Sequence, residues 1–185
     1  MSLPAEPIGL SSFIPEAGER RISEAVLRQG QAPRRANRFS KLALLAARGL
    51  DGQPRPERLG LIVGTVLGPH ESTAQVHNDM MDFGDAGVSP TAFSHSVHNV
   101  AAAYIAQTFG ICGPCLTVTD FGDVSGRCRQ LAGCWLAEGL CDGVLTVLVD
   151  EAGFVFDRIE ADFGEPFAGV HERAQAILLT RKGTE

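Results

Sequence analysis

The sequence contains no long hydrophobic run, no leader-like N-terminus and no excess of basic residues. A membrane-spanning helix needs roughly 20 apolar residues in a row, and no segment approaches that length, so we expect no membrane span. The N-terminal sequence MSLPAEPIGLSSF lacks the basic and apolar regions of a signal peptide, which favours the cytoplasm. The formal net charge of −6 disfavours nucleic acid as a partner, because phosphate binding needs a basic surface. The same charge disfavours direct docking on an acidic carrier protein.

Cysteines are few and odd in number, at positions 112, 115, 128, 134 and 141. In a chain expected in the cytoplasm, most should be reduced and buried as small hydrophobic side chains. A zinc site built from the first four is disfavoured, because Cys128 and Cys134 lie six residues apart on a predicted helix, about 240° around its axis. We therefore expect neither a metal nor a cofactor.

One pair of cysteines forms a motif with a known chemistry. Cys112-Gly113-Pro114-Cys115 matches the active-site tetrapeptide of thioredoxins, in which the first cysteine lies at a helix N-terminus that lowers its pKa. Here a β-branched run follows at residues 116–119, which predicts a strand where that helix would begin. A thiol-redox enzyme that uses Cys112 and Cys115 therefore stays as an alternative with little support.

The composition and the hydrophobic pattern predict one α/β domain over residues 1–185. Hydrophobic residues make up 44% of the chain and charged residues 21%, values typical of a globular protein. Near-continuous apolar runs such as 59–67 and 144–149 predict strands buried on both faces. Strands are predicted at 7–13, 59–67, 116–119, 144–149, 154–156 and 174–180, helices at 37–48, 70–83, 92–109 and 124–138, a short helix between 15 and 33, and a Gly/Pro-containing stretch at 162–170. This alternation predicts a mainly parallel sheet with helices on both faces, in the order βαβαβαββ. We expect residues 61–65, 116–118 and 145–149 to be buried neighbours in that sheet.

A series of residues between 89 and 151 follows one family pattern. The series is Pro90, Phe93, Asn99, Gly113, Pro114, Gly139, Asp142 and Glu151. With these residues the segment resembles the N-terminal half of a β-ketoacyl synthase of the thiolase superfamily, and the resemblance covers nearly the whole chain. It implies one half of a thiolase-like fold. The family's reactive cysteine falls at Gly122 here, and glycine has no thiol, so the resemblance implies the scaffold without a catalytic residue.

Two further segments resemble one subgroup of that superfamily. The subgroup comprises synthase-like proteins from aryl-polyene and xanthomonadin-type pigment clusters. Their Arg-rich helix is similar to PRRANRFSKLALLAA at 33–47, and one of their signature sequences is similar to FSHSVHNVAAAYIA at 93–106. Those proteins are non-catalytic and chain-length-factor-like. The resemblance implies a catalytically silent pseudoenzyme that works with an active ketosynthase in polyketide or fatty-acid-type biosynthesis, including aryl polyenes.

The turn around Gly122 is the candidate site for an acyl group or a partner. Asp120, Phe121 and Asp123 form this turn with Gly122. The two aspartates could act as a carboxylate pair, so an enzyme that uses this turn is another alternative, although capping and the helix dipole already explain aspartate at a helix N-terminus. Ser125 does not lie in a GxSxG elbow, and we expect it to cap or pack in the first turn of its helix.

Two histidines and an asparagine precede the glycine-proline turn. His95 and His98 lie three residues apart and should share a helical face, but no carboxylate on that face completes a metal site. In the resembling family the segment with Asn99 lies close to the active-site turn and the dimer interface, so His98 and Asn99 join the candidate site. We expect both to bond to buried loop backbone.

The resemblance also implies how the chain meets its partners. In the family, two subunits pair antiparallel through the strand before the nucleophile, here Leu116, Thr117, Val118 and Thr119, which predicts a homo- or heterodimer. Arg34, Arg35 and Arg38 form a small basic face that is either solvated or contacts a carrier protein or an acidic subunit. An acyl carrier protein is thus a second expected partner. A structural homodimer that rebuilds a whole thiolase-like sandwich is the remaining alternative.

Overall fold

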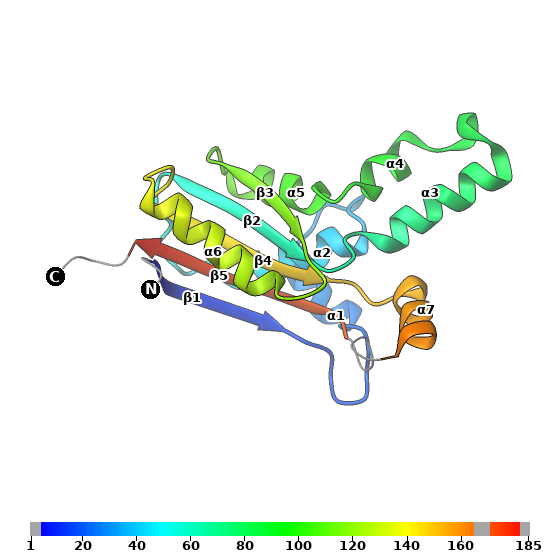
Figure 1. The fold of residues 1–185 in the computed structure, drawn as a ribbon, viewed down its shortest axis with the longest axis horizontal. Helices are drawn as coiled ribbons and strands as arrows, with labels where there is room; N and C mark the ends of the chain where they lie inside the picture. Colours follow the sequence, from blue (N-terminus) through cyan, green and yellow to red (C-terminus); the bar gives the residue numbers. More distant parts are fainter. Residues whose placement is uncertain (1–4, 165–170, 182–185) are drawn as a thin grey trace.

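A computed structural model describes residues 5–164 and 171–181 as a single mixed sheet with helices on both faces (Figure 1). The strands are β1 (Ala5–Phe13), β2 (Leu59–Thr65), β3 (Cys115–Thr119), β4 (Gly143–Asp150) and β5 (Arg173–Arg181), in the order β1-β5-β4-β2-β3. β2 pairs parallel with β3 and β4, whereas β5 pairs antiparallel with β4 and β1. Four of the five strands therefore run in one direction, and the expected α/β class is confirmed.

The helices connect the strands. They are α1 (Glu24–Leu27), α2 (Arg38–Arg48), α3 (His70–Phe83), α4 (Pro90–Ser96), α5 (Val100–Phe109), α6 (Val124–Ala137) and α7 (Phe154–Phe163), with 3-10 turns η1 (Arg28–Gly30) and η2 (Asp85–Gly87). Helices α2 and α5 cover one face of the sheet, whereas α6 covers the other. The predicted elements at 37–48, 70–83 and 124–138 agree with α2, α3 and α6 to within a residue at each end. No helix in the described part of the chain is long and apolar enough to cross a membrane.

Successive residues of the central strands face two separate cores. Leu61 and Val63 of β2 pack into a core with α2 and α5, and Ile62 between them packs with α6 on the other face. This alternation follows from the two-residue period of a strand. It explains why β2 and β4 are apolar almost throughout, since both of their faces are covered.

Helix α2 is the most buried helix and is fixed at both ends. The Asn37 side chain accepts a hydrogen bond from Ser40 N at 3.0 Å, which caps the first turn. Gly49 ends the helix against β1, and a Cβ at this position would lie 2.5 Å from Ser11 Cβ. The amphipathic pattern predicted α2 because its apolar residues meet both the sheet and α5.

Helices α3 and α4 project from one end of the molecule, and we call residues 70–96 the α3–α4 arm (Figure 1). Within this arm only His70 and Val76 of α3 are buried, and α4 has no buried residue. The side chains of Met81 and Phe83 are 86% and 72% exposed. The arm thus has little core of its own in the isolated chain.

The predicted helix at 92–109 is wrong, because the chain forms two helices there. α4 ends at Ser96, Val97 is extended (φ −80°, ψ 140°), and α5 begins at Val100. Distant side chains hold the break: Asn37 Nδ2 donates to His95 O at 3.1 Å, and Thr73 Oγ1 donates to Ser96 O at 3.1 Å. His95 and His98 therefore do not share a helical face.

The predicted strand at 154–156 is also wrong, because these residues begin α7. A three-residue apolar run does not distinguish a strand from a helix. The amide of Asp157 donates to Gly153 O at 2.9 Å, and Arg158 pairs with Asp162 one turn later at 2.8 Å, both helical spacings. Of the expected Gly/Pro stretch at 162–170, residues 165–170 lie outside the described part of the chain.

Candidate functional site

The carboxyl ends of β2, β3 and β4 meet at one end of the sheet, where ligands bind in many open α/β folds. Asp150, at the end of β4, joins three strands there. Its carboxylate accepts hydrogen bonds from Thr65 Oγ1 (2.9 Å) and Val66 N (2.6 Å) at the end of β2. The same group accepts one from Arg173 Nε (2.6 Å) at the start of β5. This end of the sheet is therefore held rigidly.

The turn between β3 and α6 is closed by its two aspartates. Asp120 accepts hydrogen bonds from Gly122 N at 2.7 Å and Arg127 Nε at 3.1 Å. These contacts lower the pKa of the Asp120 carboxyl, the amide of Gly122 contributing most. Asp123 caps α6 by accepting from Gly126 N at 2.8 Å. Both carboxylates thus stabilise the turn itself.

Gly122 lies in the turn between β3 and α6, where the resemblance in sequence implies the family's nucleophile. The residue is exposed, and a Cβ built on it would have one neighbour within 4 Å, Asp120 Oδ1 at 3.2 Å. The position therefore has room for a side chain and lacks one. Phe121 beside it is 66% exposed. Ser125 lies half-buried in the first turn of α6, and Asp123 is the cap, so of the two roles expected for Ser125 the structure agrees with packing and not with capping.

His98 and Asn99 are exposed in the connection between α4 and α5, contrary to the expected bonds with buried backbone. Within the described residues neither side chain makes a hydrogen bond. The His98 ring lies over the turn after β2, where a Cβ on Gly68 would come within 2.6 Å of His98 Cδ2. Gly68 also has a φ of +66°, so both its conformation and its neighbour require glycine.

A buried ion pair that sequence patterns did not indicate lies beneath the first helix. Arg38 donates to both carboxylate oxygens of Glu172, from Nε at 2.6 Å and from Nη2 at 2.8 Å. Glu172 also accepts from Ile22 N at 2.6 Å, and its hydrogen bond to Arg38 raises the pKa of that guanidinium. Arg38 therefore points inward and is not part of the expected basic face, whereas Arg34 and Arg35 are exposed.

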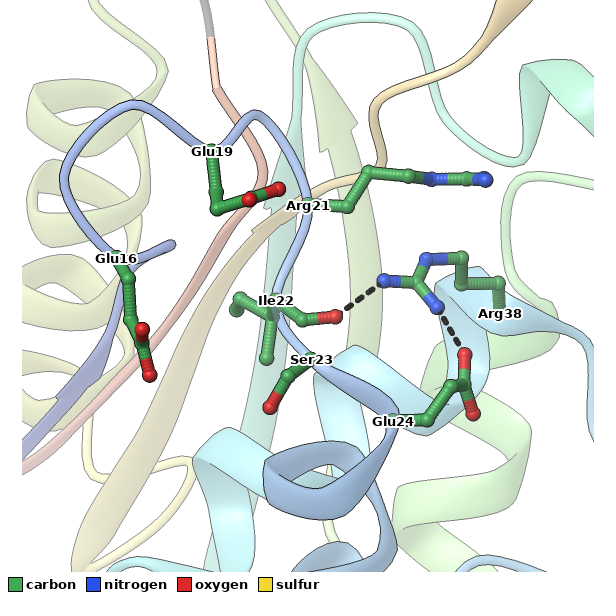
Figure 2. A pocket seen from close by; sticks show the side chains of 7 residues that line it. All are labelled: Glu16, Glu19, Arg21, Ile22, Ser23, Glu24 and Arg38. Atoms are coloured by element: carbon green, nitrogen blue, oxygen red, sulfur yellow. Dashed lines mark hydrogen bonds and ion pairs between the residues drawn. The ribbon is translucent and has the colours of Figure 1, made fainter.

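Arg38 of this ion pair also lines an open pocket of about 470 Å³ (Figure 2). Arg21 and Arg38 line it together with Glu16, Glu19 and Glu24. Arg38 is already bonded to Ile22 O and to Glu24, as Figure 2 shows. The mixture of charges and the occupied guanidinium give this pocket no clear preference for a ligand of either sign.

A second buried acid follows β4. Glu151 is 1% exposed, accepts a hydrogen bond from Glu71 N at 3.2 Å, and lies 4.0 Å from His70 Nδ1. Burial raises the pKa of Glu151 to about 7, and burial lowers the pKa of His70. Two adjacent acids at the end of a largely apolar strand, Asp150 and Glu151, are the sequence signal that could have indicated this polar layer.

β3 is an open edge of the sheet. It bonds to β2 on one side and to no described strand on the other, and Leu116 is 38% exposed. β3 is the predicted neighbour of β2, but it is half-exposed where we expected a buried strand. Two pockets of about 240 and 310 Å³ lie along α5 beside this edge and share Asn99 and Ala103. We call this hollow the α5 groove.

The cysteines do not form the expected buried set. Only Cys128 and Cys141 are buried, whereas Cys112, Cys115 and Cys134 are exposed, and all five are free thiols. Cys115 is the first residue of β3, so no helix begins after the CGPC motif, as predicted. Burial and the neighbouring Cys112 raise the pKa of Cys115, the opposite of what an activated thiol needs. In the described residues no cluster of ligands could hold a metal ion.

No protein-family model and no curated protein matches the sequence. Solved structures do match in three dimensions. One is the ketosynthase ApeO in complex with its chain length factor ApeC from Xenorhabdus doucetiae, with a TM-score of 0.74, 16% identity, and coverage of 98% of this chain and 81% of that chain. Another is the ishigamide ketosynthase/chain length factor, with a TM-score of 0.73, 19% identity, and coverage of 83% and 47%. The chain has the fold of ketosynthases and chain length factors.

A third match has the same ketosynthase fold. The complex of the type II PKS acyl-carrier protein with its ketosynthase bound to the hexaketide, AntDE:AntF, has a TM-score of 0.66 and 13% identity, with coverage of 87% of this chain and 50% of that chain. This chain thus spans most of one matching chain and about half of the other two. Very different sequences therefore form the same ketosynthase fold.

Within this ketosynthase fold the structure gathers most of the predicted site residues at one end of the sheet. Asp120, Phe121, Asp123 and Ser125 lie on or beside the turn with Gly122. The amide of Asp120 donates to Thr65 O, at the end of β2, at 3.3 Å. The His98 ring lies over Gly68, which follows β2 in the chain. Asn99 opens the α5 groove, which reaches Leu116 and Thr117 of the β3 edge.

Proposed function

We propose that the chain is a catalytically silent, chain-length-factor-like subunit that pairs with an active ketosynthase in polyketide-type biosynthesis. The observation that carries the proposal is Gly122. Its turn has the strand on one side, the capped helix on the other and room for a side chain, yet it presents no nucleophile. Covalent condensation needs an activated thiol at such a helix N-terminus.

The open edge of β3 and the α5 groove support pairing with a second chain. An exposed edge strand offers unpaired amides and carbonyls that another strand can satisfy. Leu116 and the alanines of α5 that line the groove are apolar, so covering them would remove hydrophobic surface from water. A subunit that docks here could shape the partner's acyl tunnel across the interface without reacting, and so limit product length.

The finer parts of the proposal follow the resemblance in sequence. The segments at 33–47 and 93–106 support a role in the synthesis of aryl polyenes or related polyketide or fatty-acid-type products. An acyl carrier protein would deliver the growing chain to the active subunit, and residues 1–185 would act as one domain. Phe121, exposed beside Gly122, is the side chain best placed to contact an acyl chain at this turn.

A pairing experiment with an edge variant tests the proposal. The chain is mixed with an active ketosynthase and followed by size exclusion with light scattering, with condensation of carrier-bound substrates measured in parallel. Leu116→Lys places a charge on the β3 edge and should abolish both pairing and the associated condensation. Leu10→Lys is the matched control, because Leu10 is an exposed leucine on β1, the opposite edge strand. Equal loss with both variants, or no pairing of the unmodified chain, would contradict the proposal.

A further inference from the structure

The charges of the chain are divided unevenly along the sequence. No lysine or arginine occurs from residue 59 to residue 126, whereas six acids do: Glu71, Asp79, Asp82, Asp85, Asp120 and Asp123. The whole chain has 16 basic and 22 acidic residues, so this segment accounts for the entire net charge of −6. It comprises β2, the α3–α4 arm, α5, β3 and the turn before α6.

These elements lie together on one side of the molecule. Figure 1 shows the arm, α5 and β3 along one flank of the sheet, with β1 and β5 at the other. On that flank the arm exposes Met80, Met81, Phe83 and Phe93. The arm itself is therefore apolar and acidic, with no lysine or arginine among its residues, whereas Arg34 and Arg35 line a pocket beside α5 and Arg127 pairs with Asp120.

The acids at the tip of the arm have no role in folding that the structure shows. The side chains of Asp82 and Asp85 are exposed and form no ion pair or hydrogen bond within the described residues. Asp82 is the next-to-last residue of α3, where the helix dipole disfavours a negative charge. These acids therefore contribute no hydrogen bond or ion pair that stabilises the described chain, and a role in binding another molecule would explain them.

We propose that the arm and the adjoining β3 edge dock a different polypeptide that presents basic residues around an apolar cleft. This inference rests on the proposed function, since that polypeptide is the active subunit. A closed two-fold pair would bring the same surface of two copies together. Because every formal charge of the arm is negative, each charge contact between the arms of two copies would be repulsive. The surface therefore selects a basic partner over a second copy of this chain.

Methionine-methyl NMR provides a direct test, because the chain has three methionines and two of them, Met80 and Met81, lie on the arm. The chain is labelled at its methionine methyl groups and titrated with an amphipathic peptide of leucine and arginine. A peptide of the same length with glutamate in place of arginine is titrated in parallel. The arginine peptide should shift the Met80 and Met81 signals, the glutamate peptide should not, and added salt should weaken the effect.

A charge-matched pair of variants gives the control. Asp82→Asn with Asp85→Asn should weaken binding of the arginine peptide by roughly threefold to tenfold, since each exposed charge contact contributes modestly. Glu16→Gln with Glu19→Gln removes the same charge from exposed positions elsewhere and should leave the affinity unchanged. Equal shifts with both peptides, no shift with either, or equal weakening by both variants would overturn the inference.

Pairing with an active ketosynthase separates this inference from the proposed function. If the complex forms but Asp82→Asn with Asp85→Asn pairs as tightly as the unmodified chain, the charge selection fails and the function stands. If no ketosynthase pairs while the arginine peptide still binds the arm, the function fails and the docking surface stands. A stable dimer of this chain alone, held through the arm at low salt, would overturn the selection against a second copy.

Discussion

Asp120 and Gly122 close the turn after β3 on themselves, with the amide of Gly122 donating to Asp120 Oδ1 at 2.7 Å. Arg127, one turn into α6, bonds the other oxygen of the same carboxylate at 3.1 Å. The turn is thus built from its own residues and does not depend on a reactive side chain at position 122. This is how a scaffold of this kind can keep its geometry without a nucleophile.

The cap of α6 should have a measurable effect on stability. Asp123→Ala removes the acceptor for Gly126 N, so the free energy of unfolding should fall by about 1 kcal/mol. Urea denaturation followed by circular dichroism gives the value. Asp82→Ala, at an exposed position whose side chain forms no hydrogen bond or ion pair in the described chain, is the control and should change stability by less than about 0.5 kcal/mol. An unchanged midpoint for Asp123→Ala would refute the capping role.

Arg38 should be far more important to stability than the arginines that precede it. Arg38→Ala leaves the buried Glu172 carboxylate without its main partner. The free energy of unfolding should therefore fall by about 3–5 kcal/mol. Arg34→Ala, at an exposed position, should be nearly neutral. Thermal unfolding of both variants compares them directly, and Arg38→Met with Glu172→Gln should recover part of the loss. Similar effects of the two alanine variants would contradict the buried pair.

Glu151 should make stability depend on pH in a defined window. Its pKa rises from an ordinary value of 4.5 to about 7 in the folded chain because of burial. The folded state then holds the proton more tightly than the unfolded state, so this contribution is complete below pH 4.5 and is lost as the pH rises through about 7. Over that window the group should contribute on the order of 3 kcal/mol at most.

Glu151→Gln is the matched variant, since it keeps an acceptor for Glu71 N and cannot titrate. As the pH rises from about 4.5 to 7, the unfolding free energy of the unmodified chain should fall relative to that of this variant. The lowered pKa of His70 acts in the opposite direction, and its effect is largely common to both proteins. Parallel stability curves across the window would show that Glu151 does not titrate there.

Local patterns could predict the central elements because burial on both faces leaves a clear trace in the sequence. The apolar runs of β2 and β4 and the amphipathic pattern of α2 belong to this class. The break between α4 and α5 could not be predicted, because Asn37 and Thr73 hold it from elsewhere in the chain. The short run at the start of α7 was too brief to distinguish a helix from a strand.

The candidate site was predictable in part for the same reason. The turn at 120–123 is continuous in sequence, so the resemblance to β-ketoacyl synthases could locate its aspartates and Gly122. Arg38 and Glu172 are 134 residues apart, and only the fold brings them together. Without Glu172, the arginine resembled an ordinary surface residue. His98 is exposed because it lies in the break between α4 and α5, which local sequence patterns could not predict.

The acyl state of each subunit tests the central claim, a silent partner with an empty nucleophile position, most directly. The chain and an active ketosynthase are incubated with an acyl-carrier thioester, and the intact mass of each is measured. The account predicts an acyl adduct on the ketosynthase and none on this chain, at Cys112, Cys115, Cys128 or elsewhere. Gly122→Cys, which the turn has room to accept, should stay folded and serves as the reference for a thiol at that position. A stoichiometric acyl adduct on the unmodified chain would contradict the account.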